Sequence, residues 1–310
     1  MPVFRIRSNH YRDACFKVVT DQPTFSCVFS GIIRIFDNCM KQFILAITLM
    51  LASACQGFEP FTFIQMSDTQ IGFIDTSPRF AHSDSLMKAA VDAANDLDPA
   101  YVFVTGDLVD NPADPVQDSV FRTRLAELRM PVYTVPGNHD YMGFTQEKQA
   151  AYIALRGYDR FAFRDKGCTF IGIDTNCIKD GVEEAEAEQW DWLVKELDAA
   201  RGSRYTFVFL HCPVVRERED EPEDYFNFSM EKRHQYVSLF KEKGVSAVFA
   251  GHTHQEYDVV IDGIRFVTAG PVGNALGHGT PGYNVVRVTR DGFEVRYTPT
   301  PGIDPTHCRF

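Results

Sequence analysis

Short apolar runs alternate with longer amphipathic segments along most of this 310-residue chain. Five runs are rich in Val, Ile, Phe and Tyr, a composition typical of buried β-strands. They span residues 61–66, 101–105, 132–135, 206–210 and 247–250. Segments with helical spacing of apolar residues cover 83–97, 116–128, 184–199 and 231–243. Strands that alternate with helices predict an α/β protein whose core sheet is partly parallel.

Two of the predicted helices show which face should be buried. In residues 83–97 the apolar face carries Leu86, Ala90, Ala93 and Leu97. Ser83 or Asp84 is the expected N-cap of that helix, because both side chains can accept a backbone N–H bond. In residues 184–199 we expect Trp190 and Leu193 to point inward.

Two later regions have the alternation of antiparallel strands. Residues 159–175 read as a pair of strands joined by Asp165-Lys166-Gly167. Four further runs, at 257–260, 264–268, 283–289 and 293–297, read as a β meander. The strand content therefore exceeds that of a single parallel sheet.

Polar residues that can bind metal ions follow each of the five strand-like runs. The blocks are Asp68-Thr69-Gln70, Gly106-Asp107, Gly137-Asn138-His139-Asp140, His211 and Gly251-His252-Thr253-His254. In an open α/β sheet, ligands bind beyond the carboxyl ends of the strands. We therefore expect these five blocks to converge on one site. Any one His here would more often be a core residue, but the joint pattern argues against that interpretation.

The order of these blocks resembles the signature of the calcineurin-like metallophosphoesterases, from about residue 60 to the end of the chain. One block departs from the family pattern, because Gln70 stands where the family usually has His. The Asp-x-Gln subgroup is similar, and some of its members are assigned as Ser/Thr protein phosphatases. The resemblance implies a four-layer α/β/β/α sandwich of two mixed sheets, over residues 58–300.

The resemblance also implies a role for each site residue. The first metal ion would be held by Asp68, Gln70, Asp107 and His254. The second ion would be held by Asp107, Asn138, His211 and His252, with Asp107 bridging the two. A hydroxide that bridges the ions would attack the phosphorus, and His139 would protonate or stabilise the leaving oxygen. Asp110 and Asp140 are the two candidates for orienting His139.

Charge and ligand type refine the expected function. Two dications and two carboxylates leave a site near +2, which favours a phosphate ester such as a phosphomonoester, a nucleotide or a phosphoprotein. Gln70 offers an oxygen ligand, so we expect Mn²⁺, with Fe or Zn as alternatives. Gln70 could instead be no ligand at all. That departure motivates the alternative of a degenerate, non-hydrolytic surface lipoprotein that binds a phosphorylated ligand, although His139 argues against it.

The N-terminal region has the features of an export signal. Residues 40–55 hold a Met, a Lys, a short apolar core and Ala-Ser-Ala-Cys, which match a signal peptide with a lipobox-like Cys55. We expect an exported protein, periplasmic or at the cell surface, anchored to the membrane only through lipid on Cys55. Residues 1–39 then read as an over-long gene start or an unstructured leader. A genuine extension with a short buried helix is the alternative.

Charge and cysteine content limit the partners and the cross-links. The net charge is −11, and it is more acidic without the first 54 residues, so broad contact with nucleic acid is not expected. Cys168, Cys177, Cys212 and Cys308 lack zinc-site spacing and are expected to be mostly free, buried thiols.

Several loop residues have two interpretations. Tyr225 and Asn227 could cover the site or pack on the following helix, and His278 could line the substrate mouth or be exposed. The acidic run at 217–224 reads as a solvated loop. Three further histidines, His82, His234 and His307, read as surface residues.

Overall fold

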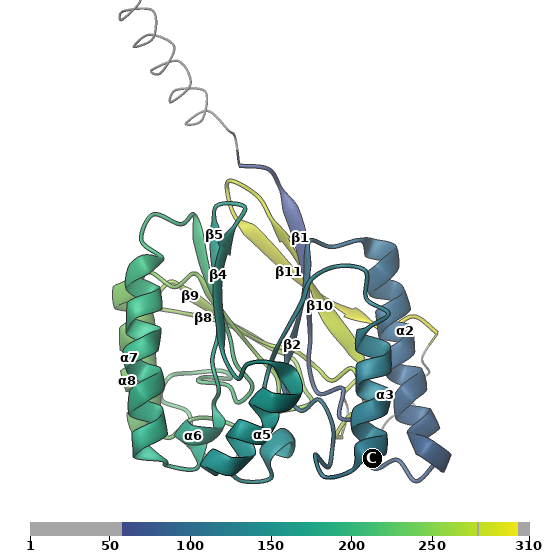
Figure 1. Ribbon diagram of the computed structural model, residues 1–310. Coiled ribbons are helices and arrows are strands. Elements are labelled where there is room, and N and C mark those ends of the chain that lie inside the picture. Colours follow the sequence, from purple (N-terminus) through teal and green to yellow (C-terminus); the bar gives the residue numbers. More distant parts are fainter. Residues whose placement is uncertain (1–57, 278, 303–310) are drawn as a thin grey trace, which may run out of the picture. The chain divides into compact units, whose positions relative to one another are not determined.

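Two mixed β-sheets face each other in the computed structural model, which describes residues 58–277 and 279–302 (Figure 1). The first sheet has the order β11-β10-β1-β2-β3, with β1 (Phe61–Met66), β2 (Tyr101–Thr105), β3 (Val132–Val135), β10 (Gly282–Val288) and β11 (Phe293–Pro299). The second sheet has the order β4-β5-β6-β7-β9-β8, with β4 (Phe161–Asp165), β5 (Cys168–Gly172), β6 (Tyr205–Phe209), β7 (Ala247–Ala250), β8 (Tyr257–Ile261) and β9 (Ile264–Thr268).

Helices cover the outer face of each sheet, so the predicted four-layer sandwich is confirmed. On one side lie α2 (Ala81–Leu97) and α3 (Pro115–Leu125), and on the other α7 (Glu183–Ala199) and α8 (Met230–Lys243) (Figure 1). Among the described residues, the other helical elements are η1 (Pro78–Phe80), which is a 3₁₀ turn, α4 (Asn138–Tyr141), α5 (Gln146–Arg156) and α6 (Asn176–Lys179).

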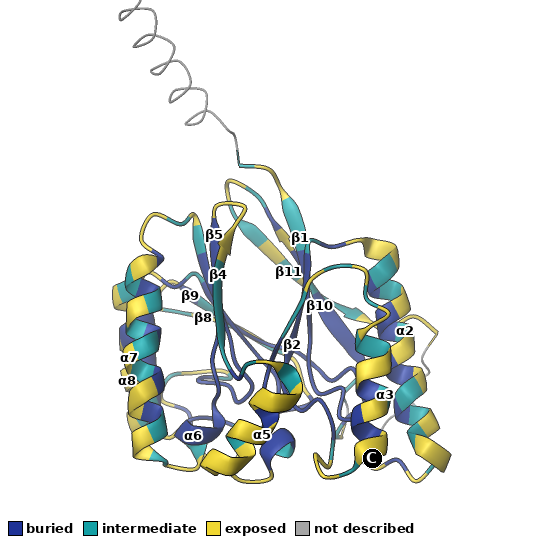
Figure 2. Cartoon of the chain, in the orientation of Figure 1, coloured by how far each residue is buried: buried dark blue, intermediate teal, exposed yellow. Residues whose placement is uncertain are grey.

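Alternation along the strands divides the core into two parts. In β1 and β2, Phe63 and Phe103 point between the sheets, while Ile64 and Val102 join the cluster that includes residues of the helices. This follows from the two-residue period of a strand. The space between the sheets is filled largely by aromatic rings, and Phe103 stacks on Phe209 with centroids 3.9 Å apart. The central strands are buried on both faces (Figure 2).

Helix α2 begins earlier than the sequence predicts. Its N-cap is Phe80, whose side chain makes no capping bond, so the prediction of a cap at Ser83 or Asp84 is wrong. The hydroxyl of Ser83 instead donates to the Asp75 carboxylate at 2.7 Å. Leu86 and Ala90 are buried as predicted, but Leu97 lies at the helix end and is 45% exposed.

The predicted β meander is also wrong, because the four strands belong to different sheets. In the second sheet, β9 pairs in parallel with β7 and antiparallel with β8, the strand that precedes it in the chain. β10 crosses to the first sheet, where it pairs antiparallel with β1, and β11 follows as the edge strand. The predicted antiparallel pair within 159–175 is confirmed as β4 and β5.

Cys168, Cys177 and Cys212 are free and buried, as predicted. Within the residues that the structure describes, no helix has the length and apolar character needed to cross a membrane. The predicted leader, signal peptide and Cys55 lie outside the described residues, as do His278, His307 and Cys308.

Candidate metal centre

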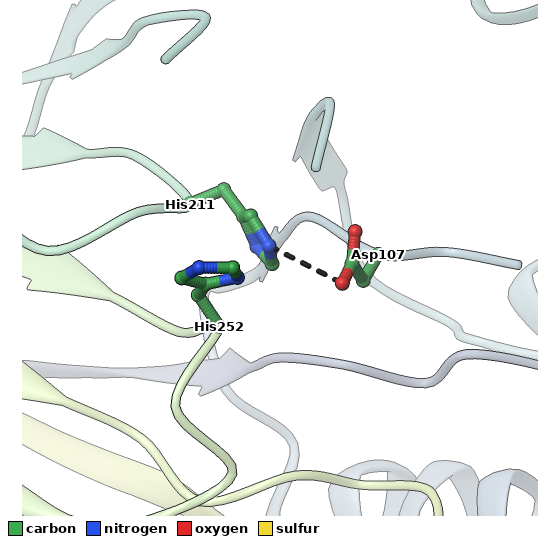
Figure 3. A group of neighbouring side chains, drawn as sticks. All are labelled: Asp107, His211 and His252. Atoms are coloured by element: carbon green, nitrogen blue, oxygen red, sulfur yellow. Dashed lines mark ion pairs between the residues drawn. The ribbon is translucent and has the colours of Figure 1, made fainter. Parts of the chain in front are cut away.

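The five polar blocks meet where β1, β2, β3, β6 and β7 end, as their positions after the strands predict. Asp107, His211 and His252 each offer a ligand atom, and these atoms lie within 4.8 Å of one another (Figure 3). All three residues are buried. Two imidazoles and one carboxylate at this spacing form a donor set suited to a divalent transition metal.

Asp107 lies at the centre of the cluster. One carboxylate oxygen is 3.3 Å from His211 Nε2, and the other accepts the backbone N–H of His139 at 2.8 Å. Burial alone would raise the pKa of Asp107, but the imidazole of His211 holds it well below its usual range. The carboxyl group is therefore ionised, as a metal ligand must be.

The ring of His211 is fixed by the backbone. Its Nδ1 is 2.8 Å from the carbonyl oxygen of Thr105, which can only accept a hydrogen bond. Nδ1 therefore carries a proton, and Nε2 is directed toward Asp107. Burial lowers the pKa of His211, but the charge of Asp107 outweighs burial and raises this pKa to about 9.

Asp68 and His254 form a second pair beside this cluster. His254 Nε2 is 3.6 Å from an Asp68 oxygen, and the Nδ1 atom of His254 faces the carbonyl oxygen of Asn274 at 2.8 Å. Asp68 also accepts the backbone N–H of His252 at 3.0 Å. Complete burial raises the pKa of Asp68 in spite of the neighbouring imidazoles.

Gln70 is the residue that departs from the pattern of the other blocks. Its backbone N–H donates to the carbonyl oxygen of Asp107 at 2.8 Å, so the residue is tied to the centre of the cluster. Its side chain is buried, and its Oε1 atom has no hydrogen-bond partner among the described residues. A buried amide oxygen without a partner is unfavourable unless another group satisfies it. A metal ion is such a group, so this donor fits a cation.

The backbone of the cluster is unusual. Left-handed φ angles occur at Asp68 (49°), Gln70 (34°), Asp107 (49°), His252 (72°) and His254 (53°). Two glycines permit the close approach of the loops. A Cβ atom on Gly137 would lie 2.2 Å from Asp107, and one on Gly251 would lie 1.7 Å from Ser67 Oγ. Gly106, which directly follows β2, has a positive φ of 85°.

Asn138 and His139 are the first residues of α4, which follows β3, and they lie beside the cluster. Asn138 Oδ1 is 3.0 Å from His211 Nε2. His139 Nδ1 lies 3.0 Å from a carboxylate oxygen of Asp110, which settles the choice between its two candidate partners. Asp140 instead accepts the N–H groups of Gly137 and Leu108. Burial lowers the pKa of His139, but the bond to Asp110 and nearby charges raise it to about 9.

Comparison with known proteins identifies this arrangement. Residues 61–256 match the calcineurin-like phosphoesterase family. The chain belongs to this family. Family members depend on two metal ions and hydrolyse phosphate esters, so the chain is a metallophosphoesterase.

Its relatives include protein phosphatases. The chain is 32% identical over 261 residues to the serine/threonine-protein phosphatase CPPED1 of Danio rerio, an alignment that covers 77% of this chain and 84% of that protein. A dimetal phosphatase structure from Danio rerio has a TM-score of 0.60 at 14% identity, covering 77% of this chain and 96% of that one. The structure of the purple acid phosphatase PPD1 from yellow lupin has a TM-score of 0.62 at 14% identity. The match covers 80% of this chain and 52% of that one. These two structures show the common fold.

The acidic run at 217–224 and His82 differ from what the sequence predicts. The acidic run at 217–224 is not simply solvated, because Glu221 is buried and accepts the N–H groups of Arg216, Glu217 and Arg218. His82 is half-buried and contacts Asn274 at 3.0 Å, whereas the sequence placed it on the surface.

The loop after Glu221 covers the site. Tyr225 contacts Asn138 and His252, which favours the first of its two interpretations. Asn227 is buried within the loop and donates to Glu221, so it holds the loop together.

Proposed function

We propose that this phosphoesterase is an exported phosphomonoesterase that removes phosphate from serine or threonine side chains of proteins. The main observation that supports this proposal is the cluster of Asp107, His211 and His252, together with the Gln70 Oε1 atom, which has no hydrogen-bond partner among the described residues. The protein substrate is supported by the CPPED1 relatives, which are named serine/threonine-protein phosphatases.

Seven residues would hold the metal ions. We assign Asp68, Gln70, Asp107 and His254 to the first ion, and Asp107, Asn138, His211 and His252 to the second. Two bound cations would supply positive charge to the phosphate and activate the attacking water. The oxygen of Gln70 favours a hard ion, so we propose Mn²⁺, with Fe or Zn as the alternatives.

His139 is proposed to protonate the leaving oxygen. Its Nδ1 is held by both the carboxylate and the carbonyl oxygen of Asp110, the latter at 3.1 Å. Nε2 is therefore the ring nitrogen that can donate a proton to the departing serine or threonine oxygen. A proton donated in this way contributes a factor of roughly 10² to 10⁴ in rate.

The test measures hydrolysis of a phosphoserine peptide, para-nitrophenyl phosphate and its bis ester with Mn, Fe, Zn and Mg. The Asp107→Asn variant should lose both turnover and bound metal. His139→Gln should lower kcat by about 100-fold or more while it retains the metal. A folded protein that binds two ions and hydrolyses no ester with any metal would support the non-hydrolytic alternative instead.

The proposed location has its own test. The signal-like residues 40–55 support export with lipid attached to Cys55. Intact mass of the mature protein should show a lipidated N-terminus at Cys55, and Cys55→Ser should release the protein from membranes. A product that retains Met1 would contradict both the export signal and the interpretation of residues 1–39.

A further inference from the structure

One exposed aromatic residue contacts two of the proposed metal ligands. Tyr225 is 60% exposed, so burial does not explain its position. Its hydroxyl is 3.0 Å from Asn138 Nδ2, and its carbonyl oxygen is 3.1 Å from His252 Nε2. We propose that Tyr225 is a positioning residue that orients Asn138 and His252 for the second metal ion. This inference rests on the proposed metal assignment.

The contact with Asn138 selects which end of its amide faces the cluster. The Nδ2 group is a donor that no cation can use, whereas Oδ1 is a suitable ligand. Because Nδ2 donates to the Tyr225 hydroxyl, Oδ1 is turned toward His211, at 3.0 Å from its Nε2. Without the hydroxyl, the amide would be free to rotate, and part of the population would present the wrong atom.

The contact with His252 selects its tautomer. A carbonyl oxygen can only accept, so the bond to Tyr225 places the proton on Nε2. Nδ1 then has the lone pair that a metal ion requires. The rings of Tyr225 and Phe226 also pack beside the imidazole, with centroids 4.9 Å and 5.4 Å from that of His252. One residue thereby acts on two ligands of the same ion.

The loop that carries Tyr225 is firmly held. Glu221 accepts three backbone N–H groups and the side-chain amide of Asn227. Arg233 is fully buried and donates to the carbonyl oxygens of Glu219, Glu221 and Phe228. These bonds give an acidic, polar loop a fixed conformation, which a positioning role requires.

Lys179 anchors the loop from a different element. Its ammonium group donates to the carbonyl oxygens of Asp224 and Asn227, on either side of Tyr225 and Phe226. The tyrosine is therefore clamped between two fixed points.

The test compares Tyr225→Phe with a matched control, Tyr205→Phe. The Tyr225→Phe variant removes the hydroxyl that contacts Asn138 and keeps the backbone carbonyl that contacts His252. The control also removes a hydroxyl, one that donates to the carbonyl oxygen of Arg290 at 3.1 Å at the opposite end of β6. Manganese binding to the full protein is followed by calorimetry and electron paramagnetic resonance, which resolve two binding constants. Tyr225→Phe should weaken one constant by about 10-fold, the lower end of the effect of removing an outer partner of a ligand. Tyr205→Phe should weaken neither.

The Gln70→His variant identifies which constant belongs to which ion. In our assignment it acts on the first ion, so its effect and that of Tyr225→Phe should fall on different constants and add in the double variant. Equal manganese affinity in Tyr225→Phe and the unchanged protein overturns the inference. So does an effect of both variants on the same constant.

One further measurement distinguishes a positioning role for Tyr225 from a merely structural one. The melting temperature of metal-free Tyr225→Phe should equal that of the metal-free parent, since a merely structural hydroxyl would lower it. If the parent itself fails to bind two ions, the proposed function fails. If it binds two and Tyr225→Phe does the same with equal affinity, only the role of Tyr225 fails.

Discussion

At the scale of single residues, the site is built from strained backbone. Five of the seven proposed ligands have left-handed φ angles, a conformation that costs roughly 1–2 kcal/mol for a residue with a side chain. Backbone bonds between the loops hold this geometry: Asp68 N–H donates to Gly106, and Gln70 N–H donates to Asp107. The strain directs several side chains from short loops toward one point.

The first residue-scale prediction concerns the departure from the family pattern. Gln70→His replaces an oxygen ligand by an imidazole nitrogen, which binds zinc more strongly. We expect tighter binding of the first ion and a shift of preference from manganese toward zinc, measured by competitive metal titration. Histidine tolerates a positive φ better than most residues, so the backbone should accept the change. Unchanged affinity for both metals would show that Gln70 is not a ligand.

A second prediction concerns Asp174, a buried carboxyl group away from the proposed ligands. Burial, with the charge of Asp159, raises its pKa to about 7. The folded protein therefore holds a proton that the unfolded chain has released, and stability falls as pH rises from about 4 to 7. Asp174→Asn mimics the protonated form and can still accept from the N–H of Asn176. The melting temperature of Asp174→Asn relative to that of the parent should therefore increase between pH 5 and pH 8. A constant difference over this range would contradict the argument.

The sequence predicted that the proposed ligands converge on one site, but it did not predict their conformations. The residue types and their positions after strands were enough to place Asp107, His211 and His252 together. The positive φ of Asp107 could not be predicted from the sequence pattern, because it depends on hydrogen bonds between loops that are distant in the sequence. The choice between Asp110 and Asp140 was also open, since both lie near His139 and only the loop geometry separates them.

At the scale of elements, the loops after the strands must approach one another closely. Gly137, after β3, allows contact with Asp107, after β2, because a side chain would overlap its backbone and carboxylate. The same holds for Gly251, after β7, against Ser67, after β1. The site therefore needs the strand order and the absence of two Cβ atoms together.

We predict that Gly137→Ala disrupts both fold and site. The added Cβ would lie 2.2 Å from Asp107, and relief of such overpacking costs about 1–3 kcal/mol of unfolding free energy. Gly292→Ala is a matched control, because a Cβ at Gly292 meets no atom within 4 Å. The melting temperature and the number of bound metal ions should both decrease in Gly137→Ala, and neither should change in Gly292→Ala. Normal metal binding by Gly137→Ala would show that the loops can separate.

Most strands and the long helices were predicted to within a few residues, because their apolar periodicity is strong. Short helices such as α4 were missed, since it begins inside the Gly-Asn-His-Asp block and has too few residues for a period. The meander was mistaken because alternation identifies a strand but not its neighbour. Only the pairing of β9 with β7, and of β10 with β1, assigns them to different sheets.

At the scale of the whole described domain, a stable aromatic core supports one buried polar edge. Phe63 makes edge contacts with five other phenylalanine rings between the sheets. At the strand ends, the carboxylates and imidazoles of the site are buried close to one another. Metal binding therefore stabilises the native state, because the unfolded chain lacks this arrangement of ligands.

Removal of metal should lower the melting temperature. Each ion at 100 times its dissociation constant contributes about 2.7 kcal/mol, which corresponds to a decrease of roughly 5 to 10 °C per ion in a domain of this size. Differential scanning calorimetry with and without a chelator measures this shift. Asp107→Asn serves as the control and should melt at the same temperature in both conditions. An equal melting temperature for the parent in both would mean that the ions contribute nothing to the fold.

The pairing of β1 with β10 has a consequence for synthesis. Gln65 and Asn284 are hydrogen-bonded although 219 residues separate them. The ribosome must therefore synthesise the chain through β10 before this side of β1 can form its hydrogen bonds. A premature stop codon ahead of Gly282 would leave that edge open to aggregation, even though every proposed ligand had already been translated.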